Sequence, residues 1–169
     1  VRAAIAELGY QPNAAARALR SGSSRTVALL APVGGIRIFA NPFFAELASA
    51  VEDAARARGL DLLLTTSTPD ERALQARMRD LAARQVDGVL LLAGAPFDRA
   101  PIDALGVPWL LLNSMDRAEG GHGIGVDLAA GAAAATAHLA ALGRRRIAFL
   151  GETGTDGQGR PEPRRRGWE

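Results

Sequence analysis

The 169-residue sequence contains no cysteine, which excludes disulfide bonds, thiolate chemistry and cysteine-ligated metals. It contains no lysine either, so all 20 basic residues are arginine. Aromatic residues make up only 5% of the chain, so a buried core must depend on Leu, Val and Ile. The two histidines, His122 and His138, lack neighbours at metal-ligand spacing, and we expect neither a metal nor a cofactor.

Long apolar runs are also missing. The first residues do not form a signal peptide because their apolar stretch is short and Glu7 interrupts it. No window reaches the length of a membrane span, so we expect a cytoplasmic protein with no membrane partner. The net charge is only +2, but arginines gather near both ends of the chain: Arg17, Arg20, Arg25, Arg160, Arg164, Arg165 and Arg166. Such clusters contact phosphates or stay solvated, and a terminal run favours solvation.

Apolar runs and helix signals alternate from residue 26 onward. The runs are continuous rather than alternating, which is typical of parallel strands covered on both faces. The predicted strands are Val27–Ala31, Leu60–Thr65, Val86–Leu92, Val107–Leu112 and Arg146–Leu150. The predicted helices are residues 42–58, 71–84, 101–106 and 127–142, with Asn41 and Asp127 as caps. This order predicts an α/β fold with a doubly wound parallel sheet. Residues 153–169, rich in Gly, Pro and Arg, are either a binding loop that is ordered in a longer protein or an unstructured tail, and we favour the tail.

Ligands of such sheets bind beyond the carboxyl ends of the strands, where Phe43 and Phe44 open a predicted helix. Two adjacent aromatic residues cannot both face the sheet. Either one lies at the ligand crevice and stacks on a ring, or the pair packs on the loop of residues 34–40.

Motifs of enzymes are not present. The glycines at 151, 154, 157 and 159 are followed by prolines, and no Gly-Lys-Ser/Thr sequence supports a phosphate loop. Ser114, Asp116, His122 and Asp127 lack the Gly-x-Ser-x-Gly turn of a nucleophile. The acidic residues Glu52, Asp53, Asp61 and Asp87 are interpreted as solvated faces or strand edges. We therefore predict that the chain is not an enzyme.

Several collinear segments resemble the LacI/GalR family of bacterial repressors. They are residues 3–19 (AIAELGYQPNAAARAL), 41–47 (NPFFAEL), 86–91 (VDGVLL), 126–127 (VD) and 138–151 (HLAALGRRRIAFLG). The resemblance implies a periplasmic-binding-protein-like core of type I. It divides the chain into a remnant of a helix-turn-helix head (1–9), a hinge helix and linker (10–25), a first effector-binding and dimerisation lobe (26–126), and a partial second lobe with the tail (127–169). It also implies that the chain is truncated at both ends.

The resemblance implies a DNA-facing hinge helix over residues 13–20. Leu19 would wedge into a minor-groove base step, and Asn13, Ala16, Arg17 and Arg20 would lie along the groove. The alternative for Leu19 is packing on the core lobe or on Tyr10. An eight-residue helix is not stable alone in water, so its folding would be coupled to DNA contact.

The resemblance also implies an effector crevice, with a sugar as the expected ligand. Phe43 and Phe44 match positions that stack on the ligand, and Asn113 matches a position that hydrogen-bonds it. Arg164 matches an arginine that clamps hydroxyls or a carboxylate. Asp127 matches a position at the crossover between the lobes, where helix capping is an equally good explanation.

The chain is thus interpreted as a fragment of a dimeric, sugar-responsive repressor whose partners are operator DNA, a small effector and a second copy. Two alternatives stay open: a sugar-binding protein of a transporter, which would have no hinge, and a non-functional truncated product. An enzyme with a Rossmann-like domain is disfavoured by the missing motifs.

Overall fold

The computed structural model describes residues 7, 18, 20–31, 40–68, 70–92, 100–112, 122–151 and 162–169. The described residues up to Leu110 form one compact unit, and those from Leu111 to Glu169 form a second. The boundary between the lobes expected at Asp127 stays a prediction. None of the described helices has the length and apolarity needed to span a bilayer.

A five-stranded sheet confirms the predicted α/β fold. Its strands are β1 (Thr26–Ala31), β2 (Asp61–Thr66), β3 (Gly88–Leu92), β4 (Trp109–Leu112) and β5 (Gly123–Ile124), in the order β2-β1-β3-β4-β5. β1 pairs in parallel with both β2 and β3, so Leu29 lies between Leu64 and Leu90. Parallel neighbours require crossover connections, which the helices supply.

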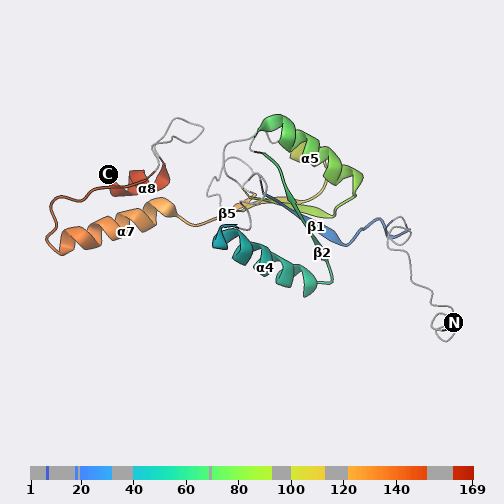
Figure 1. Cartoon of the computed structure of the whole chain (residues 1–169), viewed down its shortest axis with the longest axis horizontal. Helices are drawn as coiled ribbons and strands as arrows, with labels where there is room; N and C mark the ends of the chain where they lie inside the picture. Colours follow the sequence, from blue (N-terminus) through green and yellow to red (C-terminus); the bar gives the residue numbers. More distant parts are fainter. Residues whose placement is uncertain are drawn as a thin grey trace. The chain divides into compact units, whose positions relative to one another are not determined.

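Two helices of the first unit cover opposite faces of the sheet (Figure 1). They are α4 (Pro42–Arg56) and α5 (Glu71–Ala83), and a short third helix, α6 (Ala100–Asp103), precedes β4. Asn41 caps α4 by accepting a hydrogen bond from the amide of Phe43 at 3.0 Å. Helices on both faces of a parallel sheet define the doubly wound arrangement predicted from the sequence.

The core of this unit is aliphatic, as the shortage of aromatic residues requires. Its largest fully buried side chains are Leu30, Leu81, Val89, Leu91 and Ile102. They come from two central strands and from the two helices α5 and α6. Each buried leucine or isoleucine contributes about 1.5–3 kcal/mol by leaving water.

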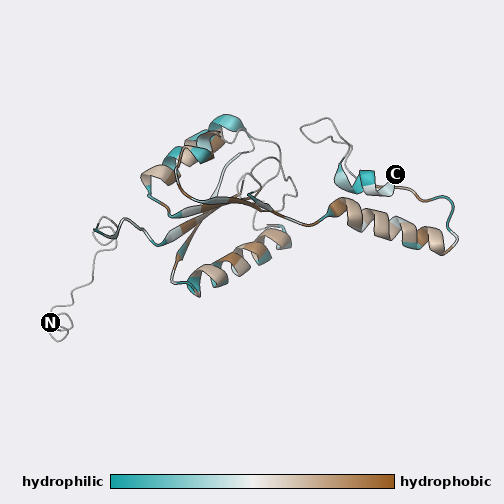
Figure 2. Cartoon of the chain, turned by 180° about the vertical axis from the view of Figure 1, so that it is seen from behind, coloured by the Kyte–Doolittle hydropathy of each residue, from teal (hydrophilic) through white to brown (hydrophobic). Residues whose placement is uncertain are grey.

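The second unit contains α7 (Leu128–Ala141), which packs against α8 (Pro163–Trp168). The indole Nε1 of Trp168 donates to the carbonyl of Ile147 at 3.3 Å, and its ring lies 6.0 Å from that of Phe149. Figure 2 shows that α7 is apolar along most of its length, yet none of its residues is buried. Its alanine-rich sequence therefore favours the helical conformation but contributes no side chain to the core.

Two sequence predictions in the second unit are wrong. Arg146–Leu150 is not a strand: residues 144–150 have no regular structure, and Leu150 is 99% exposed. A strand requires a hydrogen-bonded neighbour, and this segment has none among the described strands. Residues 163–168 are not an unstructured tail but the helix α8, which begins with Pro163 and is capped by Glu162.

Candidate functional site

The aromatic pair at the start of α4 is placed by its cap. Asn41 and Pro42 fix the first turn of α4, the helix that follows β1 in the chain. A ligand crevice is expected at this end of the sheet, beyond the carboxyl end of β1. Phe43 is 45% exposed and Phe44 is half-buried, and their rings meet edge to face at 5.4 Å. An aromatic ring left this open offers a flat apolar surface to a ligand. The loop of residues 34–40 on which the pair was alternatively expected to pack lies largely outside the described residues.

Polar side chains gather where β2 ends. Thr68 donates a hydrogen bond from its hydroxyl to the carboxylate of Asp70, and this bond lowers the pKa of Asp70. The Oγ of Ser67 is buried and has no hydrogen-bond partner among the residues that the structure describes. Ser67 and Thr68, but not Asp70, border an open hollow of about 370 Å³, lined by Thr66, Ser67, Thr68, Ala73, Ala76, Arg77 and Asp80. The Arg77 guanidinium forms an ion pair with the Asp80 carboxylate at 3.3 Å, so the positive charge beside this hollow already has a partner.

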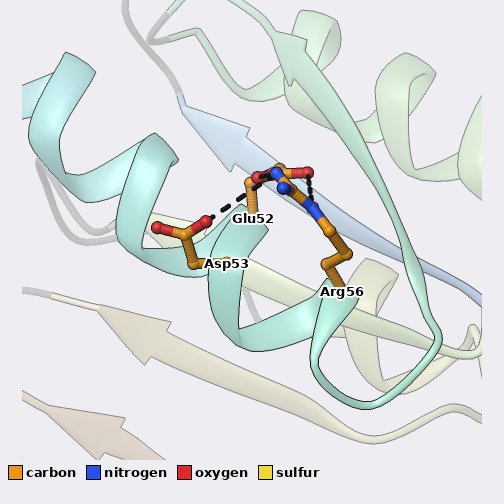
Figure 3. A network of polar contacts seen from close by, with 3 residues as sticks. All are labelled: Glu52, Asp53 and Arg56. Atoms are coloured by element: carbon orange, nitrogen blue, oxygen red, sulfur yellow. Dashed lines mark hydrogen bonds and ion pairs between the residues drawn. The ribbon is translucent and has the colours of Figure 1, made fainter.

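Two acidic residues of α4, Glu52 and Asp53, share one arginine partner. Glu52 and Asp53 both contact Arg56, as Figure 3 shows, and all three side chains are at least 41% exposed. The Arg56 Nε donates to Glu52 at 2.9 Å, and this interaction raises the pKa of Arg56. The arrangement is a solvated ion-pair cluster one helical turn long, as expected from the sequence. Across the described ranges, no group of three His, Asp or Glu side chains could hold a metal ion.

Two of the expected effector residues that the structure describes lie in the second unit. Asp127 caps α7: its Oδ1 accepts a hydrogen bond from the amide of Ala130 at 2.9 Å. Arg164 lies on α8 and pairs with Glu162 at 2.8 Å. It borders a hollow of about 280 Å³ that is also lined by Phe149, Leu150, Gly151 and Glu162. Asp127 is thus seen as a helix cap, and Arg164, like Arg77, lies beside an open hollow while paired with an acidic neighbour.

The end of the expected hinge lies directly before the sheet. Arg20 is exposed and helical, and the amide of Gly22 donates to the carbonyl of Ala18 at 2.8 Å. Gly22 has a φ of 69°, the left-handed conformation that ends many helices. Ser21 is also helical, so this helical segment ends one residue beyond the predicted end at Arg20.

A further polar contact was missed by the sequence interpretation. Asp87, expected to be a solvated strand edge, accepts hydrogen bonds from the Ser23 hydroxyl and from the amides of Ser24 and Arg25. These hydrogen bonds lower the pKa of Asp87, and the bond from Ser23 has the largest effect. No local signal could have revealed the contact, because donor and acceptor are more than 60 residues apart in sequence.

The remaining predicted site residues lie outside the described residues. These are the hinge residues Asn13, Ala16, Arg17 and Leu19, and the effector residue Asn113.

Comparison with known proteins identifies the family. The profile described as "Periplasmic binding proteins and sugar binding domain of LacI family" matches residues 36–169. The chain is 35% identical to the HTH-type transcriptional regulator GntR of Pseudomonas aeruginosa, covering 89% of this chain and 43% of that protein. It is 36% identical to the HTH-type transcriptional regulator CelR of Thermobifida fusca, covering 89% of this chain and 45% of that protein.

A solved structure agrees with these relatives. The transcriptional regulator CelR in complex with cellobiose superimposes with a TM-score of 0.71 at 31% identity, covering 99% of this chain and 49% of that chain. The chain spans less than half the length of the curated relatives named above. With its parallel sheet, capped α4 and match over most of its length, the chain belongs to the LacI family of regulators with a periplasmic-binding-protein-like sugar-binding domain.

Proposed function

We propose that this chain serves in a sugar-responsive transcriptional repressor, supplying effector-binding surface and a DNA-facing hinge. One observation carries the regulatory part of this proposal. The family profile begins at residue 36, but the similarity to CelR covers 99% of the chain and so includes residues before the sheet. A core shared with periplasmic binding proteins does not require that preceding segment, whereas a DNA-bound regulator does.

On the DNA side, the proposal assigns the groove contacts to Asn13, Ala16, Arg17 and Arg20, with Leu19 as the wedge. Arg20 is exposed just before the sheet, where a phosphate can reach it. Arginine contacts to phosphates release counterions, so the binding should weaken steeply as salt rises. A homodimer would present two hinges to a palindromic operator.

On the effector side, the proposal assigns Phe43 and Phe44 to stacking on the apolar face of a sugar ring. Asn113 and Arg164 would hydrogen-bond its hydroxyls, and Asp127 would add a carboxylate or act only as the α7 cap. The open ring of Phe43 and the cavity beside Arg164 support this division of roles. The CelR structure contains cellobiose, which makes β-linked glucosides a reasonable first group of sugars to test.

The mechanism we propose is a coupling between two binding sites, without catalysis. A sugar that binds one conformation of the protein more tightly shifts the population toward it. If that conformation binds operator less well, the sugar and the DNA weaken each other's binding by the same factor. The site of action would be the cytoplasm, where operator DNA is found.

The test uses the polypeptide as its gene encodes it. Sheared genomic DNA from the source organism is selected on the immobilised protein, and a panel of mono- and disaccharides is screened by thermal shift. We expect the recovered fragments to share one palindromic site and one sugar to raise the melting temperature. That same sugar should release the DNA, while sugars without a thermal shift should not.

The alternative is a sugar-binding protein of a transporter, which the description of the family also covers. Sugar binding without selective recovery of DNA would favour this alternative. Absence of both sugar binding and selective DNA binding would contradict the proposed function altogether.

A further inference from the structure

The segment Ser23–Arg25 joins the end of the hinge to the first strand, and one carboxylate holds all three residues. The Oδ2 of Asp87 accepts from the Ser23 hydroxyl at 2.7 Å and from the Arg25 amide at 2.7 Å. Its Oδ1 accepts from the Ser24 amide at 3.0 Å. Three donors from successive residues on one ionised acceptor form a charge-assisted contact, stronger than ordinary hydrogen bonds.

A second contact ties the same segment to another turn. Arg25 adopts a φ of 56°, which is uncommon for a residue with a side chain. Its Nε donates to the carbonyl of Gly59 at 2.9 Å, in the turn between α4 and β2. Gly59 itself has a φ of 66°, and a Cβ there would lie 2.3 Å from the Arg25 guanidinium. The unusual backbone conformation of Arg25 is thus held by two contacts, its amide with Asp87 and its side chain with Gly59.

The sheet begins immediately after these contacts. The Arg25 carbonyl accepts from the amide of Asp61 at 2.7 Å, and the Thr26 carbonyl accepts from the amide of Asp87 at 2.8 Å. The contacts therefore lie at the amino ends of the three strands β1, β2 and β3. The expected effector loops follow the carboxyl ends, so β1 connects the two regions directly through the core.

We propose that Asp87 is a positioning residue that fixes the direction in which the DNA-facing segment leaves the sheet. This inference rests on the proposed function for its consequence in DNA binding. The contact reduces the conformational freedom of residues 23–25 before DNA is bound, so less ordering entropy is lost on binding. Loss of the contact should weaken DNA binding without touching the sugar site.

The test compares Asp87→Asn and Ser23→Ala with Asp53→Asn, a control that also removes one carboxylate but on the exposed face of α4. Asn keeps one carbonyl oxygen and turns its amide group toward the remaining donor, whereas Ser23→Ala removes one of three donors. In hydrogen exchange followed by NMR, we expect protection of the Ser24 and Arg25 amides to fall about tenfold in Asp87→Asn. Ser23→Ala should lose less, and the core amides of Leu29 and Leu30 should keep their protection.

The second readout is binding of each variant to a fluorescent random-sequence DNA duplex at low salt, measured beside the sugar-induced thermal shift. We expect Asp87→Asn to bind DNA several-fold more weakly, with the thermal shift unchanged and Asp53→Asn equal to the parent. The inference is overturned if Asp87→Asn keeps the protection of Ser24 and Arg25 or its DNA affinity. It is also overturned if core protection falls equally, because Asp87 would then only stabilise the fold. A parent protein that binds no DNA would contradict the proposed function, whereas the hydrogen-exchange result would still decide whether Asp87 holds the segment.

Discussion

The indole Nε1 of Trp109 donates a hydrogen bond to the carboxylate of Asp103 at 2.8 Å. Trp109 begins β4 and is only 9% exposed, and Asp103 ends the short helix α6. The contact satisfies the one polar atom of a large buried side chain and fixes α6 to the strand that follows it.

Removal of this acceptor should destabilise the first unit. In Asp103→Ala the indole N–H loses its partner in a nearly buried position, and we expect a loss of about 1–3 kcal/mol in the free energy of unfolding. Urea denaturation followed by tryptophan fluorescence and circular dichroism measures it. Asp80→Ala, which removes an exposed carboxylate bound to Arg77, should cost less than about 1 kcal/mol. Equal losses in the two variants would show that the Trp109 contact contributes nothing specific.

The packing of α8 on α7 is tested by two glycines. At Gly167 an added Cβ would lie 2.1 Å from the backbone carbonyl oxygen of Ala129, whereas at Gly131 it would meet no atom of the described residues within 4 Å. Gly167→Ala should therefore separate the helices, and Gly131→Ala should stabilise α7 by about 0.5–1 kcal/mol through helix propensity.

The two variants are compared by thermal unfolding in a Trp109→Phe background, so that fluorescence reports Trp168 alone. We expect opposite changes in melting temperature, with a shift of the Trp168 emission in Gly167→Ala only. If Gly167→Ala left both unchanged, the helix α8 would not pack where the structure places it.

The contact of Asp87 should depend on pH in a defined direction. Its hydrogen bonds lower its pKa in the folded protein, so the stabilisation is fully present above the unfolded pKa of about 3.9. It is lost as the pH falls through the lower folded pKa. An NMR titration of the aspartate carboxyl carbons should show Asp87 titrating below the unfolded value, and protection of the Arg25 amide should persist through pH 5. In Asp87→Asn the protection of that amide should be weak at every pH and should not change between pH 3 and 6.

The two phenylalanines at the start of α4 should differ in their roles. Phe43 is largely exposed, so Phe43→Ala should change the melting temperature little but weaken sugar binding by about tenfold if it stacks on the ligand. Phe44 is half-buried, so Phe44→Ala should reduce stability as well. Isothermal calorimetry and thermal unfolding separate the two effects. Unchanged sugar affinity in Phe43→Ala would remove it from the effector site.

The elements of the first unit could be predicted because their signals are local. Asn41 and Asp70 accept hydrogen bonds from amides two and three residues away, and β1 is a continuous apolar run between polar segments. The predicted strand over 86–92 was too long at its start, since Val86 and Asp87 precede β3. The Asp87 side chain accepts hydrogen bonds from Ser23, Ser24 and Arg25, so this residue holds the segment before β1 instead of extending β3.

The second unit shows where such signals fail. Arg146–Leu150 has the composition of a strand, but a strand exists only where a neighbour accepts and donates its hydrogen bonds. Glu162 and Pro163 are a typical local signal for the start of a helix. The Gly, Pro and Arg residues around them favoured the prediction of an unstructured tail. The docking of Trp168 on Ile147 and Phe149 joins residues about 20 positions apart, which no local pattern encodes.

The sequence by itself therefore determined the family, the α/β class and the helix caps, because each depends on residues close together along the chain. Only the tertiary structure decided that Asp87 holds Ser23–Arg25, that Arg25 reaches Gly59, and that Phe43 rather than Phe44 remains open. These relationships arise when distant segments meet at the ends of parallel strands, and there the choice of hydrogen-bond partner is made by geometry in space.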